Sequence, residues 1–250
     1  MVWRHPEGRL RLSADDVHVW AADLDLARSR DPALDSTLSP EELLRGERFR
    51  RPRDRARFVA SRGVLRRLLA GYLTRPAHAL RFTSGPHGKP ALSEKSNALD
   101  LRFNASRRGE VALYAFALGR EVGVDVERVD TGFATREVAE RFFSVSEVET
   151  LRRLSDEEQI EAFFNCWTRK EAYLKAVGTG LSTELDSFDV SLAPGAPAAL
   201  LRAAGGHAET ARWTLHALRP NPGSVGALAF ESGPTELSLW RFPPRAWLTI

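Results

Sequence analysis

The sequence has little cysteine, and it lacks long apolar runs. Its one cysteine, Cys166, cannot form an internal disulfide, and burial in a core is the ordinary role of such a residue. No apolar run approaches the roughly 18 residues that a membrane-spanning helix needs. The first residues contain no apolar core of the kind found in signal peptides. These absences favour the cytoplasm and argue against a membrane partner.

Lysine is also scarce. It occurs only at Lys89, Lys95, Lys170 and Lys175, and arginine supplies the other positive charges of a chain whose net charge is +3. A guanidinium does not substitute freely for a compact ammonium group that must reach an anion. The few lysines are therefore candidate contacts to anions, and three of the four fall in the motifs described below.

Arginine is concentrated in one segment, residues 45–67, where only Glu47 and Asp54 oppose it. Such a run usually forms a solvated basic face. A phosphate-rich ligand or an acidic protein partner are the functional alternatives. Nucleic acid is the weakest alternative, because no binding module is recognisable and no aromatic residues alternate with the basic ones.

The remaining composition, 43% hydrophobic and 28% charged residues, is that of a globular protein with one large domain or two small ones. Periodicity and turn residues predict a loop at 84–90, a turn at 104–109 and a hairpin joining strands 111–118 and 122–128. The other predicted strands are 17–22, 99–103, 187–192, 211–218, 225–230 and 237–241, and the predicted helices are 39–49, 53–72, 135–142, 145–153 and 157–177.

The helix predicted at 157–177 carries the first candidate chemistry. Its apolar positions recur at spacings of three and four and define one buried face; they are Ile160, Phe163, Phe164, Trp167 and Leu174. Glu171 lies on or beside this face, where a bare carboxylate is costly. It therefore needs a cation, which can be Lys175, an arginine or a metal ion. A purely structural Glu171–Lys175 pair one helical turn apart is the simpler alternative.

The strand predicted at 122–128 carries the second group of candidate catalytic residues. Its side chains alternate, so Asp125 and Glu127 share one face and the valines share the other. Two carboxylates on one face repel each other unless a positive charge lies between them. With Glu171 as a third ligand, this all-oxygen set favours Mg²⁺ or Mn²⁺ over zinc. Together with the basic segment, it points to phosphate transfer.

These two stretches carry a family resemblance. Gly123-Val124-Asp125-Val126-Glu127, followed by Trp167-Thr168-Arg169-Lys170-Glu171-Ala172-Tyr173-Leu174-Lys175, resembles the paired signature of the 4′-phosphopantetheinyl transferases, most closely the surfactin-synthetase-activating (Sfp-like) type. The resemblance extends through Gly88-Lys89-Pro90 and Phe103-Asn104-Ala105-Ser106 and covers residues 39–190.

The resemblance implies an α+β fold of two similar lobes that form an intramolecular pseudo-dimer. The N-terminal lobe would span 1–119, and the C-terminal lobe, 120–250, would carry the metal site. Coenzyme A would bind in the cleft between the lobes. Because both halves of the site then lie in one chain, a monomer would suffice.

The implied activity is a Mg²⁺-dependent transfer (Mn²⁺ being a possible substitute). The enzyme would move the 4′-phosphopantetheine group of its co-substrate coenzyme A to a serine of an acyl, peptidyl or aryl carrier protein. This reaction releases 3′,5′-ADP and converts the apo carrier to the holo carrier, as secondary metabolite biosynthesis requires. Carrier proteins of this kind are acidic, so a basic surface on the enzyme would attract them.

The family pattern assigns the metal ligands and catalytic residues. Asp125, Glu127 and Glu171 would bind Mg²⁺, and Lys175 would lie beside the diphosphate of coenzyme A. Asp125, Glu171 and Lys175 would be the catalytic residues. A serine hydroxyl is a weak nucleophile that needs a base, and Glu171 and a metal-bound water both remain candidates.

The same pattern assigns coenzyme A contacts to Lys89, Pro90, Arg45 and Arg57, with the first two next to the adenine and phosphates. Ser106 and Arg107 complete the predicted coenzyme A contacts. The family usually has histidine at the position after Ser106, where it contacts the 3′-phosphate; this chain has Arg107.

An arginine can hold a phosphate with two hydrogen bonds and stays charged at any pH, so Arg107 is expected to take over the contact. A second departure is Glu42, which stands where the family has a basic contact.

Two other classes of protein remain as alternatives. A non-catalytic protein that binds coenzyme A or a carrier could keep the fold, although every acid and lysine of the motif is present. A metal-dependent phosphodiesterase or nuclease would need further His or Asp ligands near the motif strand. His87, His207 and His216 are isolated in the sequence and do not supply them.

Overall fold

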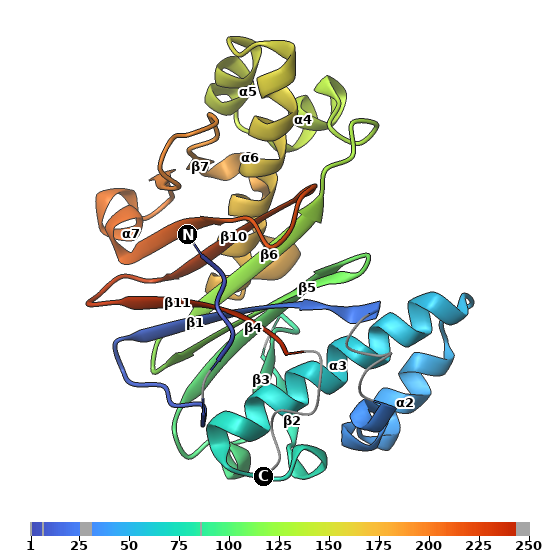
Figure 1. The fold of residues 1–250 in the computed structure, drawn as a ribbon. Coiled ribbons are helices and arrows are strands. Elements are labelled where there is room, and N and C mark those ends of the chain that lie inside the picture. The colour runs from blue at the N-terminus through green and yellow to red at the C-terminus, as the bar shows by residue number, and fades with distance from the viewer. Residues whose placement is uncertain (1, 7, 26–31, 86, 244–250) are drawn as a thin grey trace. The chain divides into compact units, whose positions relative to one another are not determined.

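The chain passes back and forth between two structural units in the computed structural model, which describes residues 2–6, 8–25, 32–85 and 87–243 (Figure 1). Unit 1 comprises Met1–Thr83, Pro90–Gly119 and Glu236–Ile250, and unit 2 comprises Ser84–Lys89 and Arg120–Thr235. The contiguous lobes predicted from the sequence, 1–119 and 120–250, differ from these units at 84–89 and from 236 onward. Pro86 of the predicted loop lies outside the described residues.

Unit 1 is built on a four-stranded sheet with the order β11-β1-β5-β4. These strands are β11 (Glu236–Arg241), β1 (Asp16–Asp23), β5 (Val111–Leu118) and β4 (Leu101–Arg108). β1 runs parallel to β11 and antiparallel to β5, so the last of the described strands completes the sheet of the first. This pairing explains why the segment that begins at Glu236 belongs to unit 1.

The turn predicted at 104–109 is wrong. β4 continues through that segment and pairs with β5 as far as Arg108, opposite Val111. The chain reverses at Gly109, whose positive φ of 60° suits a residue without a side chain. Polar residues in the second half of the strand resemble a turn in sequence, because one side of this strand is exposed.

Helices cover the sheet of unit 1. α3 (Pro52–Leu73) buries Ala60, Val64, Leu65, Leu68 and Leu69 against Trp20, Phe103, Tyr114 and Phe116 of the sheet. α2 (Pro40–Glu47) begins at Ser39, and Ser39 and Glu42 form the capping box that their spacing predicts. The helices expected at 39–49 and 53–72 are therefore confirmed, and one apolar core holds α3 to the strands.

The short elements in the described part of unit 1 are three 3-10 helices and a two-stranded sheet, whose strand β2 extends one residue into unit 2. They are η1 (Pro32–Thr37), η2 (Ala77–Ala79), η3 (Glu94–Ser96), β2 (Phe82–Ser84) and β3 (Pro90–Leu92).

Unit 2 has a three-stranded antiparallel sheet with the order β6-β10-β9. Its strands are β6 (Val122–Arg128), β10 (Ser224–Glu231) and β9 (Trp213–Leu218), and α6 (Asp156–Val177) packs across them (Figure 1). The other elements are α4 (Arg136–Phe142), α5 (Val145–Arg152), α7 (Gly206–Arg212), β7 (Asp189–Val190), β8 (Leu200–Arg202), η4 (Gly180–Ser182) and η5 (Leu185–Ser187).

The hairpin predicted between 111–118 and 122–128 is wrong. β5 pairs with β1 and β4, whereas β6 pairs with β10. Both strands are apolar and the turn between them is short, but a turn signal does not say which sheet each strand joins. Pairing with strands distant in sequence decided which sheet β5 and β6 each joined.

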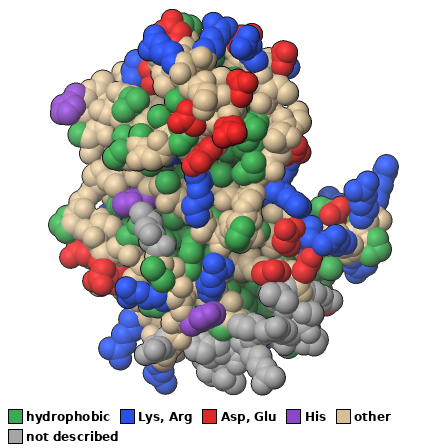
Figure 2. All heavy atoms as spheres, turned by 45° about the horizontal axis from the view of Figure 1, so that its top comes forward, with side chains coloured by type: hydrophobic (Ala, Val, Ile, Leu, Met, Phe, Trp, Pro, Cys, Tyr) green, Lys and Arg blue, Asp and Glu red, His purple; other side chains and the backbone are tan. Residues whose placement is uncertain are grey.

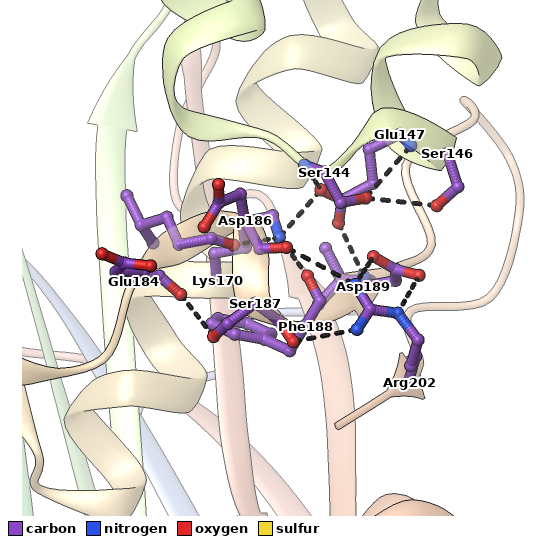
Figure 3. Close-up of polar contacts among 12 residues, drawn as sticks. Ser144, Ser146, Glu147, Lys170, Glu184, Asp186, Ser187, Phe188, Asp189 and Arg202 are labelled. Carbon is purple, nitrogen blue, oxygen red and sulfur yellow. Dashed lines mark hydrogen bonds and ion pairs between the residues drawn. The ribbon is translucent and has the colours of Figure 1, made fainter. Parts of the chain in front are cut away.

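Buried Lys170 joins α6 to α5 through an ion pair and to the chain that follows α6 through hydrogen bonds (Figure 3). The ammonium group of Lys170 donates to the carbonyl oxygens of Leu185 at 2.7 Å and Phe188 at 2.6 Å, and it lies 2.8 Å from Glu147 Oε2. The side chains of Lys170 and Glu147 are 0% and 2% exposed. All three donors of the ammonium group are thereby used within unit 2, so Lys170 is a structural lysine.

The remaining acceptors of Glu147 extend this network. Its carboxylate accepts from the backbone N–H groups of Val190 at 2.8 Å and Ser144 at 2.9 Å. On the outer side, Arg202 holds Asp189 through two hydrogen bonds of 2.8 and 2.9 Å (Figure 3). The chain after α6 is therefore held from both sides, and satisfied buried charges of this kind are costly to disrupt.

Across the residues that the structure describes, none of the helices combines the length and the apolar character that crossing a bilayer requires.

Candidate active site

A glycine lets the motif strand of unit 2 approach its motif helix. A Cβ atom at Gly123 of β6 would lie 2.2 Å from the carbonyl oxygen of Ala172 and 2.3 Å from the backbone nitrogen of Ala176. Real side chains do not reach such distances, so only glycine allows this contact. The contact fixes Asp125, two residues along the strand, against the last turns of α6.

Asp125 and Lys175 meet at this contact. Lys175 Nζ donates to Asp125 Oδ1 at 2.6 Å, and the two side chains are 30% and 4% exposed. Burial raises the pKa of Glu171, the negative charge of Asp125 raises it further, and Lys175 opposes the shift. The carboxylates of Asp125 and Glu171 are therefore close enough to repel each other, and the positive charge of Lys175 acts on both. The structure brings together these three predicted catalytic residues.

Glu127 lies two residues beyond Asp125 on β6 and is partly exposed. The alternation predicted for this strand is confirmed, since Val122, Val124 and Val126 are fully buried on the opposite face. Among the described residues, no group of three or more His, Cys, Asp or Glu side chains is gathered closely enough to hold a metal ion.

The donor chemistry still fits a hard cation. Asp125 and Glu171 present only oxygen atoms. Burial and, after it, the charge of Asp125 raise the pKa of Glu171, and a divalent ion would relieve the repulsion between the two carboxylates. The structure thus contains an acid pair with a lysine, while the three-carboxylate metal site stays a prediction.

Lys89, predicted to contact coenzyme A, is bound within unit 2. Its ammonium group donates to Glu121 Oε2 at 2.6 Å, to the carbonyl oxygen of Ala176 at 2.8 Å and to that of Val122 at 3.2 Å. These contacts tie the start of β6 to the end of α6. They also explain why residues 84–89 belong to unit 2.

Unit 1 contains a cavity of about 290 Å³ between α2, α3 and β4. Four of the predicted coenzyme A contacts line it: Arg45, Pro90, Ser106 and Arg107. They come from the end of α2, the start of β3 and the second half of β4. Residues far apart in sequence are therefore collected around one space of a size suited to part of a small-molecule ligand.

The arginines near this cavity fall into two groups. Glu42 pairs with Arg62 and, at 2.6 Å, with Arg66, so both of these α3 arginines share one carboxylate. Arg45 and Arg107 form no ion pair with any described carboxylate. Partial desolvation lowers the pKa of Arg107; Tyr114 and the carboxylate of Asp54 oppose this shift, and the charge of Arg45 adds to it. Two guanidinium groups in the lining of the cavity are therefore without an ion pair, although Asp54 offsets part of the charge of Arg107.

Arg57, the remaining predicted contact, does not line the cavity. It bonds Asp25 through Nε at 2.8 Å and Nη2 at 2.7 Å, and it also reaches Glu110 at 3.2 Å. The hydrogen bond from Arg57 is the main reason that the pKa of Asp25 falls to about 2. Arg57 thus joins α3 to the residues that follow β1 and precede β5.

The outer part of the arginine-rich segment is solvated. Figure 2 shows Lys and Arg side chains gathered at the end of unit 1 that carries α2 and the start of α3. Arg48, Arg50, Arg51, Arg53 and Arg55 are all exposed. Some of them pair with acids, as Arg55 does with Glu47 at 3.6 Å. This is the basic face that such a run usually forms.

The sequence interpretation missed several residues of these two sites. Phe49 and Phe58 line the cavity, yet their spacing from the arginines gave no alternating pattern. Lys170 stands inside the motif but serves the core. Cys166, by contrast, is fully buried as expected, and burial raises the pKa of its thiol.

Comparisons with known proteins identify the family of this chain. Residues 121–226 match the model of the 4′-phosphopantetheinyl transferase superfamily, and residues 31–118 match that of the 4′-phosphopantetheinyl transferase N-terminal region. The chain is 36% identical over 240 residues to the 4′-phosphopantetheinyl transferase HetI of Nostoc sp., a match that covers 96% of this chain and 98% of that protein. The chain belongs to the 4′-phosphopantetheinyl transferase superfamily.

Two further proteins are similar to parts of the chain. The 4′-phosphopantetheinyl transferase Sfp of Bacillus subtilis is 31% identical, over 68% of this chain and 73% of its own. The crystal structure of Thermotoga maritima holo-[acyl-carrier-protein] synthase is 22% identical over 44% of this chain and 62% of its own, with a TM-score of 0.35.

Proposed function

We propose that this protein transfers the 4′-phosphopantetheine group of coenzyme A to a serine hydroxyl of a carrier protein. The observation that carries the proposal is the cluster of Asp125, Glu171 and Lys175 in a chain that matches a family member over nearly its whole length. In the reaction, a bond forms between the serine oxygen and the phosphorus next to the pantetheine arm. The bond from that phosphorus to the bridging oxygen breaks, and 3′,5′-ADP leaves.

The residues of unit 2 suit this chemistry. Glu171 is a candidate base for the serine proton, because a raised pKa makes its carboxylate more basic. Lys175 is partly exposed, so its ammonium group is available to stabilise the charge that develops on the leaving oxygen. Asp125, Glu127 and Glu171 would hold Mg²⁺, or Mn²⁺ in its place. The ion would supply further positive charge to the diphosphate.

The cavity of unit 1 suits the nucleotide end of coenzyme A. Arg45 and Arg107 would contact a phosphate there, with Ser106 as a hydrogen-bonding neighbour and Pro90 against the adenine. Arg107 would replace the histidine usual in the family at the 3′-phosphate. Lys89 and Arg57 would act indirectly, through the contacts that anchor them.

The finer features remain predictions that the resemblance supports. They are the Sfp-like type, a pseudo-dimer of two similar lobes, a monomeric state, acidic carriers of secondary metabolism as partners, and a cytoplasmic location. The basic face on α2 and the start of α3 is compatible with an acidic partner. Transfer assays with carriers from fatty-acid, polyketide and nonribosomal-peptide pathways would sort these partners.

The test is the intact mass of an apo carrier protein after incubation with this protein, coenzyme A and Mg²⁺. We expect a gain of one phosphopantetheinyl group, lost in Asp125→Ala and Glu171→Ala. Glu157→Ala, an exposed acid at the start of the same helix, is the matched control and should retain transfer. If coenzyme A binds but no carrier gains mass, the protein is a non-catalytic binding protein. If coenzyme A is hydrolysed without a carrier, it is a phosphodiesterase.

A further inference from the structure

Two guanidinium groups of the unit 1 cavity share an aromatic floor. The Cζ atoms of Arg45 and Arg107 lie 5.7 and 5.9 Å from the ring centroid of Phe58, and that of Arg107 lies 5.8 Å from Phe49. The two rings are in contact, with centroids 5.2 Å apart. Both arginines are thus within the range in which an aromatic face attracts a cation.

The ring of Phe58 is held firmly. It is 6% exposed, and its edge lies 3.4 Å from where a Cβ atom of Gly46 would stand. Val59 and Leu38 pack in the same small apolar cluster, with Phe49 at its edge. A ring fixed in this way limits where the guanidinium groups above it can lie.

An aromatic floor differs from a carboxylate in one important respect. A carboxylate offsets the charge of a guanidinium and occupies its N–H groups, as the one Glu42 carboxylate does, shared between Arg62 and Arg66 over the ring of Phe82. A π face attracts the cation from one side and leaves the N–H edge for another acceptor. Arg45 and Arg107 therefore keep both their charge and their donors for a ligand.

We propose that Phe58, assisted by Phe49, is a positioning residue that orients Arg45 and Arg107 toward a phosphate monoester. This inference rests on the proposed function, in which that group is the 3′-phosphate of coenzyme A. The phosphate would bridge the guanidinium groups of Arg45 and Arg107. The ring of Phe58 attracts both groups, but they still repel each other. Its binding then relieves a repulsion already present in the cavity.

The experiment compares coenzyme A with 3′-dephospho-coenzyme A, which lacks the monoester. Dissociation constants are measured by calorimetry for the wild type, Phe58→Leu, Phe58→Tyr and the matched control Phe103→Leu. Phe103 lines the same cavity and is 4% exposed, but its ring contacts Phe82 and carries no guanidinium. The melting temperature of each variant checks its fold.

We expect Phe58→Leu to weaken coenzyme A binding by about tenfold and to leave 3′-dephospho-coenzyme A binding unchanged. Phe58→Tyr keeps the ring and should keep the wild-type ratio of the two constants. Phe103→Leu should also keep that ratio, whatever it does to overall affinity. If Phe58→Leu unfolds the protein, Phe49→Leu applies the same test at a less buried ring that carries Arg107 alone.

Equal weakening of both ligands by Phe58→Leu would overturn the inference and make Phe58 a packing residue. A wild type that binds both ligands equally would also overturn it, since no monoester would then occupy the cavity. Failure of the proposed function is a separate result, because it appears in the carrier mass assay of the wild type.

Discussion

The two candidate sites treat charge in opposite ways. In unit 2, Asp125 is 4% exposed and its carboxylate is neutralised by Lys175 at 2.6 Å. In unit 1, Arg45 and Arg107 have no described carboxylate partner and lie over Phe58 instead. The first arrangement pairs the Asp125 carboxylate within the protein, whereas the second leaves two guanidinium groups without an ion pair.

This difference indicates which charged residues stabilise the fold and which can bind a ligand. Charges buried in pairs, such as Lys170 with Glu147, are costly to separate and hold elements together. Exposed charges without an ion-pair partner, such as those of Arg45 and Arg107, should cost less stability when removed, and their loss should affect mainly binding. The following predictions test this distinction, from the largest expected effect to the smallest.

Lys170→Met should destabilise the protein by about 3–5 kcal/mol, because it leaves the buried Glu147 carboxylate without its cation. Urea unfolding measures the loss. The double variant with Glu147→Gln should recover part of it, since the uncompensated charge is removed. Lys95→Met, at an exposed lysine, is the control and should change the stability little. A Lys170→Met protein as stable as the control would contradict the structural role of this lysine.

Gly123→Ala should cost about 3 kcal/mol, because the new methyl group overlaps the backbone of α6 at Ala172 and Ala176. The same displacement moves Asp125 away from Lys175, so transfer should fall even below the melting temperature. Thermal unfolding and the carrier mass assay measure both effects. Gly85→Ala, where a methyl group would lie 3.6 Å from the nearest atom, is the control. Full activity in Gly123→Ala would show that the close contact is dispensable.

Acid should weaken unit 1 through His18. Its Nδ1 lies 2.8 Å from the hydroxyl of Tyr72, and burial lowers the pKa of this histidine from 6.5 to about 4. Above pH 6.5 it is neutral in both folded and unfolded chains. As the pH falls from 6.5 to 4, only the unfolded chain gains the proton, so stability decreases by about 3 kcal/mol and then levels off.

The measurement is the free energy of unfolding at several pH values between 7 and 4 for the wild type and His18→Gln. Burial also lowers the pKa of His216, so the variant should lose a part of the acid sensitivity and not the whole of it. His207→Gln, at an exposed histidine, serves as the control. Identical pH profiles for the wild type and His18→Gln would rule out His18 as a cause.

Arg107→Ala should raise the KM for coenzyme A by about tenfold with a smaller change in kcat, because a charge-assisted hydrogen bond to phosphate is lost. Arg107→His is the sharper variant. An imidazole is charged only below its pKa, so its KM should rise with pH between about 5.5 and 8, while the wild type stays flat. Unchanged KM in Arg107→Ala would remove this residue from the coenzyme A site.

Local pattern predicted much of the fold. The helices over 53–72 and 157–177 follow from apolar spacing, and the start of α2 follows from Ser39 and Glu42. The alternation of β6 predicted the shared face of Asp125 and Glu127. Pairing between distant segments was not predictable, as β11 beside β1 and the failed hairpin show. Local rules describe a strand, but its partners depend on the whole core.

The residues of the candidate sites were likewise predictable from the sequence only in part. The order and spacing of Asp125, Glu127, Glu171 and Lys175 identified the family and its chemistry from sequence alone. Arg45, Pro90, Ser106 and Arg107 also came from the resemblance, but only the tertiary structure collected them around one cavity.

The sequence by itself therefore determined the long helices, the family and the motif residues, because these depend on neighbours along the chain. Only the tertiary structure decided that Lys170 serves the core, that Lys89 and Arg57 are tied to other residues, and that Phe58 underlies two arginines. The physical reason is that the role of a charge is set by the groups that surround it in space. Burial, a nearby carboxylate and an aromatic face all arise from residues distant in sequence.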